Sequence, residues 1–118
     1  MKQDKGKLLI IDDEPLIRRA INRILSHDGW TVLEASDGKE GLQIIHDNSD
    51  IKFVFLDWIM PGMSGSEVIA VLKENGFDLK RVIVVTALSE IPENVTKEIK
   101  TVLYKPFQNI NEIIEALK

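Results

Sequence analysis

Cysteine and long apolar runs are both absent from the 118-residue sequence. The lack of cysteine excludes disulfides, and the N-terminal MKQDKGK lacks the apolar region of a secretory signal peptide. No apolar stretch approaches the roughly 20 residues that a membrane-spanning helix needs. We therefore expect a cytoplasmic protein without a membrane partner.

An excess of basic residues is missing as well. The chain has 15 Lys and Arg against 19 Asp and Glu, a net charge of -4, and no block of five like charges. Nucleic acids and anionic membrane surfaces attract proteins through clustered basic residues. The charge pattern therefore argues against a nucleic-acid partner.

The length and apolar content predict one compact domain that spans residues 1–118. Domains commonly have about 100 to 200 residues. The 44% hydrophobic content is enough to bury a core, and no linker or repeat interrupts the chain.

Short aliphatic and β-branched runs alternate with segments of helical period. The runs predict strands at 7–11, 31–35, 52–56, 81–85 and 102–104. Strands that alternate with helices favour a parallel sheet covered on both faces, and the unbroken apolar runs LLII, FVFL and VIVV fit strands buried on both sides. The predicted fold class is a doubly wound, three-layer α/β fold.

Five helices are expected between and after these strands. Pro15 suits the first turn of the first helix, and Ser64 with Glu67 forms a capping-box pattern for the third. Residues 90–99 predict only a short fourth helix, and Asn109 is the expected cap of the fifth. The apolar stripe of the first helix comprises Leu16, Ile17, Ala20, Ile21, Ile24 and Leu25.

Ionisable or hydroxylated residues stand where the apolar strands end. Asp12 and Asp13 follow LLII, Asp57 follows FVFL, Thr86 follows VIVV, and Lys105 follows the last run. In open parallel sheets, the ligand crevice lies beyond the carboxyl ends of the strands, where the strand order reverses. Carboxylates at the tips of buried strands therefore indicate one shared polar site.

Four motifs resemble the receiver domain of two-component response regulators, the CheY-like superfamily. They are DDEP at 12–15, DWIMPGMSG at 57–65, TA at 86–87 and KPF at 105–107, and the resemblance covers essentially the whole chain. It implies a flavodoxin-like parallel sheet of order 2-1-3-4-5 with five helices. It also implies a signalling phosphoacceptor and not an enzyme that turns over an external substrate.

The chemistry of these residues can also be argued without the family. Carboxylates held close together repel one another unless a cation neutralises them or their pKa values rise. Oxygen ligands alone suit a hard ion such as Mg²⁺. Phosphoryl transfer depends mainly on positioning and charge neutralisation, so a carboxylate nucleophile (Asp57), an ammonium group (Lys105) and a hydroxyl (Thr86) fit that reaction.

The resemblance implies a role for each site residue. Asp57 resembles the phosphoacceptor, which takes a phosphoryl group from the phosphohistidine of a sensor histidine kinase or histidine phosphotransfer protein, or from a small donor. The implied protein ligands of Mg²⁺ are Asp12, Asp13, Asp57 and the backbone carbonyl of Ile59. Lys105 is implied to bind a phosphoryl oxygen, and its bond to the following proline is cis in many family members.

Two departures from the family pattern lead to hypotheses. Val102 stands where many receivers have an aromatic residue that follows the threonine inward. Strand alternation places Tyr104 on the same face, so we hypothesise that Tyr104 serves the output surface instead. Ile59 and Leu88 occupy positions that tune phosphoryl hydrolysis in the family, and their bulk predicts slow loss of phosphate.

Other interpretations stay open from the sequence. Taken singly, Asp12 and Asp13 can cap a helix, Asp57 can end a strand, Thr86 is a common strand residue and a lysine is usually solvated. An aspartyl-phosphate phosphohydrolase commonly carries a second acid where this chain has Ile59, and a flavodoxin needs a phosphate loop that DDEP would repel. The remaining alternative is an interaction module that works without phosphorylation.

The expected output is contact with another protein. No DNA-binding or catalytic segment follows Lys118 in the sequence, so we expect a stand-alone or excised receiver that signals to a downstream protein. By family analogy, the contact face is formed by the fourth helix, fifth strand and fifth helix. A monomer and a phosphorylation-dependent homodimer are both compatible with the sequence.

Overall fold

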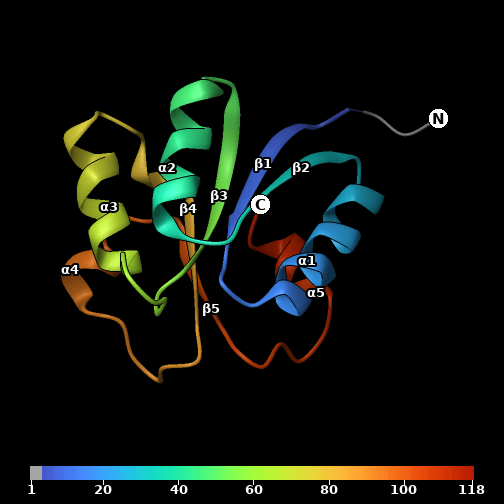
Figure 1. The fold of residues 1–118 in the computed structure, drawn as a ribbon. Helices are drawn as coiled ribbons and strands as arrows, with labels where there is room; N and C mark the ends of the chain where they lie inside the picture. Colours follow the sequence, from blue (N-terminus) through green and yellow to red (C-terminus); the bar gives the residue numbers. More distant parts are fainter. Residues whose placement is uncertain (1–3) are drawn as a thin grey trace.

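The computed structural model describes residues 4–118 and contains a parallel sheet with helices on both faces (Figure 1). Residues 1–3, the start of the expected domain, lie outside the described residues. The sheet order is β2-β1-β3-β4-β5, which confirms the expected fold. The strands are β1 (Gly6–Ile11), β2 (Trp30–Ala35), β3 (Ile51–Asp57), β4 (Val82–Thr86) and β5 (Thr101–Tyr104).

The helices form two outer layers. In Figure 1, α1 and α5 lie on one side of the sheet, and α2, α3 and α4 lie on the other. Within residues 4–118, no helix is long and apolar enough to cross a membrane. The helical segments are α1 (Pro15–His27), α2 (Gly38–Asp47), α3 (Gly65–Glu74), the 3₁₀ turn η1 (Leu79–Arg81), α4 (Glu93–Thr96) and α5 (Asn111–Glu115).

The sheet is buried on both faces because its strands supply apolar side chains in both directions. Along β1, Leu9 and Ile11 join the cluster under α2 and α3, while Leu8 and Ile10 join the cluster under α1 and α5. Burying one such side chain contributes about 1.5 to 3 kcal/mol to the free energy of unfolding. This two-sided core explains why the strands read as continuous apolar runs.

The start of α3 confirms the predicted capping box. The predicted apolar stripe of α1 is confirmed only in part. Ser64 Oγ accepts from the Glu67 amide at 3.2 Å, and the Glu67 carboxylate accepts from the Ser64 amide at 3.1 Å. In α1, Ile21 and Leu25 are fully buried. Leu16 is 79% exposed, because it lies in the first turn, next to the loop that leaves the sheet after β1.

The fifth helix is shorter than its apolar spacing suggests, but the expected capping bonds are present. The regular helix is assigned from Asn111, and Ile110 before it already has helical dihedral angles. Asn109 Oδ1 accepts from the Asn111 amide at 2.8 Å, and the Glu112 carboxylate accepts from the Asn109 amide at 3.0 Å. These are the two bonds of a capping box on Asn109, so the structure confirms Asn109 as the capping residue, although the regular helix is assigned only from Asn111. The fourth helix is a single turn, as expected.

Candidate functional site

The polar residues that end the strands meet at one edge of the sheet. Asp57 is the last residue of β3 and Thr86 the last of β4, while Asp12 directly follows β1 and Lys105 directly follows β5. The sheet order puts β1 beside β3, although β2 lies between them in the sequence. Parallel strands end on the same side, so this topology brings the residues together (Figure 1).

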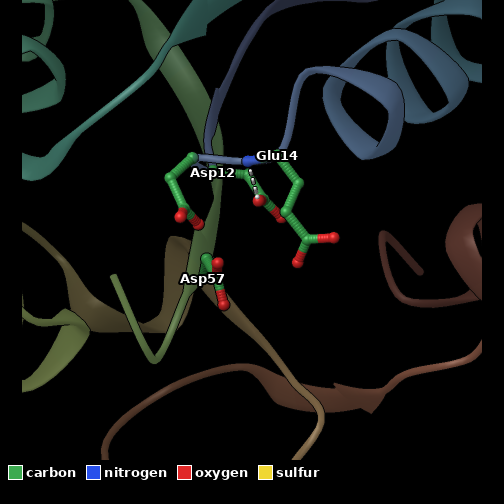
Figure 2. A group of neighbouring side chains, drawn as sticks. Asp12, Glu14 and Asp57 are labelled. Atoms are coloured by element: carbon green, nitrogen blue, oxygen red, sulfur yellow. Dashed lines mark hydrogen bonds between the residues drawn. The ribbon is translucent and has the colours of Figure 1, made fainter. Parts of the chain in front are cut away.

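Carboxylates from two elements converge at that edge. One oxygen from each of Asp12, Asp13, Glu14 and Asp57 lies within 4.8 Å of the others. Figure 2 shows Asp12 and Glu14 on the loop after β1, facing Asp57 at the end of β3. The dashed bond in that view joins the Glu14 amide to Asp12 Oδ1 at 2.9 Å. Asp12 and Asp57 are buried, with exposed fractions of 2% and 4%.

Lys105 brings a positive charge to these carboxylates. Its Nζ lies 3.1 Å from Asp12 Oδ2, 3.0 Å from Glu14 Oε1 and 3.8 Å from Asp57 Oδ2. The first two distances are hydrogen bonds, and the third is an ion pair beyond hydrogen-bond range. The ammonium group is therefore bound mainly by the loop after β1.

Glu14 is the site residue that sequence reasoning missed. The sequence indicates Glu14 only as part of the DDEP motif and not as a site residue. The structure adds its carboxylate to the cluster and to the partners of Lys105. The available signal was a third acid directly after Asp12 and Asp13, at the start of a helix.

The surroundings of Asp57 make it a weaker acid. The pKa of this carboxyl is raised from its ordinary 3.8 to about 7, mainly by burial and secondly by the negative charge of Asp12. The Lys105 charge works in the opposite direction, while hydrogen bonding with Asp13 and Asp12 favours the protonated form. Without a cation beyond Lys105, Asp57 is thus poised to change charge near neutral pH.

The pKa of Lys105 reflects the same cluster. Burial lowers the pKa of the ammonium group, because it disfavours the charged form. The hydrogen bond to Glu14 and the charges of Asp12 and Asp57 outweigh burial, so the pKa of Lys105 is raised above 10.5. Lys105 therefore carries its charge throughout the physiological range.

Thr86 and Ile59 lie beside the carboxylates. Thr86 is fully buried, and its Oγ1 accepts a hydrogen bond from the Leu88 amide at 3.0 Å. The Ile59 amide lies 3.4 Å from Asp57 Oδ1, and the Ile59 side chain is 56% exposed. The loop after β3 is thus held close to Asp57. The roles of the Thr86 hydroxyl and of the Ile59 carbonyl stay predictions.

Val102 and Tyr104 differ in their surroundings. Val102 is partly buried and packs against the cluster that contains Ile91 and Ile99. Tyr104 is 45% exposed and lines a cavity of about 570 Å³ with Glu90, Ile91, Pro92 and Glu93. The accessible aromatic group on this face of β5 is therefore Tyr104.

Two backbone features occur in the loops around the site. The Gly65 amide donates to the Trp58 carbonyl at 2.9 Å, and a Cβ atom at Gly65 would lie 2.8 Å from the Asp57 carbonyl oxygen. Only glycine permits this close approach of α3 to the end of β3. The bond between Lys105 and Pro106 is cis, as the resemblance implied.

The donor set fits a hard divalent cation. The clustered groups are carboxylate oxygens from two elements, and the negative charge of Asp12 contributes to the raised pKa of Asp57. Mg²⁺ binds oxygen ligands and commonly uses one or two carboxylates together with water. No nitrogen or sulfur donor belongs to this cluster in residues 4–118.

Comparisons with known proteins agree with this geometry. A family model described as response regulator receiver domain matches residues 8–118. The chain is 37% identical over 89 residues to Response regulator MprA from Mycobacterium sp. (strain KMS), an alignment that covers 75% of this chain and 38% of that protein. The chain thus spans well under half the length of that curated relative.

Solved structures give the same result. The Francisella response regulator 1452 receiver domain is 30% identical with a TM-score of 0.82, covering 95% of this chain and 93% of that one. Response regulator TrrA from Thermotoga maritima, solved in complex with Mg²⁺ and BeF, is 29% identical with a TM-score of 0.79, and each chain is fully covered.

Proposed function

The chain belongs to the response regulator receiver family of two-component systems, and we propose that Asp57 is its phosphoacceptor. Members of this family are signalling phosphoacceptors rather than enzymes, and they interact with histidine kinases. The observation that best supports the assignment is the meeting of Asp57 with Asp12 and Lys105 at the edge between β1 and β3. We also propose that residues 1–118 form a single receiver domain.

In the proposed reaction, a carboxylate oxygen of Asp57 attacks the phosphorus atom of the donor. A bond forms between that oxygen and phosphorus, and the bond from phosphorus to the donor breaks. The departing electron pair stays on the histidine nitrogen of a kinase or phosphotransfer protein, or on the acetate oxygen of acetyl phosphate. Burial of Asp57 keeps competing water away from the attacking oxygen.

The other residues bind and orient the transferred group. Asp12, Asp13, Asp57 and the carbonyl of Ile59 are the proposed ligands of Mg²⁺, and Glu14 is close enough to assist them. When bound, Mg²⁺ supplies positive charge to the carboxylates and to the phosphoryl oxygens. Lys105 is already charged and needs to move little to donate to a phosphoryl oxygen. The Thr86 hydroxyl is proposed as a further donor, since its oxygen accepts from the Leu88 amide and its proton remains available for donation.

The partners follow from the same proposal. A sensor histidine kinase or a histidine phosphotransfer protein must bring its phosphohistidine to the carboxyl edge of the sheet. Three exposed apolar side chains sit within a few residues of the site: Leu16, Ile59 and Leu88. They provide apolar area for docking around a charged centre. The proposed cellular location is the cytoplasm.

Phosphorylation is proposed to alter the surface formed by α4, β5 and α5, and through it the contact with a downstream protein or a second copy of the chain. Tyr104 is the proposed aromatic contact, because it is exposed while Val102 packs into the core. The one-turn α4 has no side-chain cap and no buried residue, so a small change in free energy can move it.

Intact-mass measurement tests this function. The protein is incubated with acetyl phosphate and Mg²⁺, in parallel with Asp57→Ala and with Asp50→Ala as a control at an exposed aspartate on the opposite edge. We expect one phosphoryl adduct on wild type and Asp50→Ala, none on Asp57→Ala, and loss of the adduct when EDTA replaces Mg²⁺. Absence of an adduct on wild type would favour an interaction module that works without phosphorylation.

A further inference from the structure

A network behind the acidic cluster connects α1, β2 and the backbone of Asp12. Arg18 Nη1 donates to the Asp12 carbonyl oxygen at 2.7 Å, and Arg18 Nε donates to Glu34 Oε1 at 3.1 Å. The second carboxylate oxygen of Glu34 accepts from Asn22 Nδ2 at 2.7 Å. Glu34 therefore holds Arg18 in the orientation that reaches Asp12.

The network completes the bonding of Asp12. Its amide donates to the Ala35 carbonyl at 3.1 Å, and its two carboxylate oxygens accept from the Glu14 amide and from Lys105. The bond from Arg18 occupies the remaining backbone acceptor. A residue bonded at every polar atom has little freedom to rotate, so Arg18 contributes to the direction in which the Asp12 carboxylate points.

We infer that Arg18, held by Glu34, is a positioning residue that sets the affinity of the acidic cluster for Mg²⁺ through the backbone of Asp12. This inference rests on the proposed function, since it takes Asp12 as a metal ligand. Arg18 is only 16% exposed in its side chain, and the Glu34 side chain is 31% exposed. The pair is therefore partly shielded from solvent, where hydrogen bonds to charged groups are stronger than at the surface.

Charge and geometry predict opposite effects for Arg18→Gln. Loss of a positive charge near four carboxylates, taken alone, makes the site more negative and strengthens Mg²⁺ binding. Loss of the bond to the Asp12 carbonyl loosens the ligand and weakens Mg²⁺ binding. Residues that orient metal ligands typically change metal affinity by about tenfold or more when they are replaced. We therefore expect the loss of positioning to outweigh the loss of charge, so that Arg18→Gln binds Mg²⁺ more weakly.

The chain offers two matched controls. Asn22→Ala removes the other contact between α1 and Glu34 and leaves the bond from Arg18 to Asp12 in place. It tests whether a weaker contact between α1 and β2 alone changes the site. Arg19→Gln removes the same charge from an exposed neighbour on the same helix.

The first measurement is a Mg²⁺ titration followed by the fluorescence of Trp58, with Trp30 replaced by Phe in every protein. We expect the Kd to rise about tenfold in Arg18→Gln and to stay within about twofold in Asn22→Ala and Arg19→Gln. Glu34→Ala should weaken binding in the same direction, and the double variant with Arg18→Gln should bind no worse than Arg18→Gln alone. An unchanged or lower Kd in Arg18→Gln would overturn the inference.

The second measurement needs no metal. Hydrogen exchange at the Glu14 amide, which donates to Asp12 Oδ1, reports on the order of the loop. We expect faster exchange in Arg18→Gln than in wild type or Asn22→Ala. Equal rates would contradict the positioning role of Arg18 and would leave the proposed function of Asp57 unaffected. If the wild-type protein bound no Mg²⁺ and accepted no phosphoryl group, the proposed function would be contradicted. The inferred effect of Arg18 on Mg²⁺ affinity would then be contradicted as well.

Discussion

The Nζ atom of Lys105 lies 3.8 Å from Asp57 Oδ2, beyond hydrogen-bond range, although both residues lie at the carboxyl edge of the sheet. The ammonium group instead donates to Asp12 and Glu14, at 3.1 and 3.0 Å. A phosphoryl group on Asp57 would extend acceptor oxygens beyond the carboxylate. This arrangement suits a lysine that binds the product more tightly than the free carboxylate.

Replacement of Lys105 by Met tests that role. The variant keeps most of the apolar stem but removes the charge, so phosphoryl transfer to Asp57 should slow by about 10²-fold, as for loss of one donor to a transition-state charge. The rate is measured by intact mass over time with acetyl phosphate and Mg²⁺. Lys97→Met, at an exposed ion pair with Glu93, is the control and should react at the wild-type rate. Equal rates for the two variants would rule out the role of Lys105.

The raised pKa of Asp57 predicts how stability depends on pH without Mg²⁺. Between pH 3.8 and about 7, the folded protein holds a proton on Asp57 that the unfolded chain has lost. The free energy of unfolding should therefore fall as pH rises through this window and level off above it. Each unit of pKa difference corresponds to about 1.4 kcal/mol, so the loss is of the order of a few kcal/mol.

Urea denaturation of wild type and Asp57→Asn checks this pH dependence. The neutral amide cannot ionise, so the variant should be more stable than wild type at pH 8, and the difference should shrink toward pH 5. Added Mg²⁺ should stabilise wild type more at pH 8 than at pH 6, because a protonated Asp57 competes with the metal. A stability difference that stays constant from pH 5 to 8 would show that Asp57 has an ordinary pKa.

The bulk of Ile59 predicts a long-lived phosphoryl group. Ile59 follows Asp57 by two positions, and its amide lies 3.4 Å from the Asp57 carboxylate. In Ile59→Asn, a polar side chain replaces apolar area and can hold water near phosphorus, so the phosphorylated protein should decay several-fold faster. Decay is followed by intact mass after removal of the donor. Ile110→Asn, at an exposed isoleucine near α5, should leave the lifetime unchanged. An equal or longer lifetime in Ile59→Asn would refute the shielding hypothesis.

Tyr104 is the one tyrosine in the sequence, so a single fluorotyrosine label reports on it without ambiguity. If Tyr104 serves the output surface, its ¹⁹F resonance should shift when acetyl phosphate and Mg²⁺ are added to wild type. The same addition to Asp57→Ala should cause no shift. Tyr104→Ala should in turn weaken phosphorylation-dependent binding of the downstream protein. An unchanged ¹⁹F chemical shift after phosphorylation would contradict a role of Tyr104 in the switch.

Much of the fold could be predicted because its signals are local. Pro15 at the start of α1 and the Ser64 and Glu67 pair at α3 act within one helical turn, and the continuous apolar strands reflect a sheet buried on both faces. The order of the strands came from the resemblance to a known family. The capping bonds of Asn109 and Glu112 before α5 were predictable because they are also local. The exposure of Leu16 was not, because helical spacing does not encode which side chains the rest of the fold covers.

The sequence predicts most residues of the candidate site but not the hydrogen bonds and ion pairs between them. Residues at the carboxyl ends of parallel strands share an edge of the sheet, so the sequence predicts that Asp12, Asp57 and Lys105 lie close together. The preference of Lys105 for Glu14 over Asp57 depends on differences of less than 1 Å. The bond from Arg18 to the Asp12 carbonyl involves backbone, so no pattern of side chains indicates it.

Chemical mapping of the modified residue tests whether Asp57 is the phosphoacceptor. Protein treated with acetyl phosphate and Mg²⁺ is reduced with borohydride, which converts an aspartyl phosphate to homoserine, and the position is read by peptide sequencing in a mass spectrometer. We expect homoserine at residue 57 alone, and none when Mg²⁺ is withheld. Homoserine at Asp12 or Asp13, or an unmodified Asp57 after full treatment, would contradict the assignment of Asp57 as the phosphoacceptor.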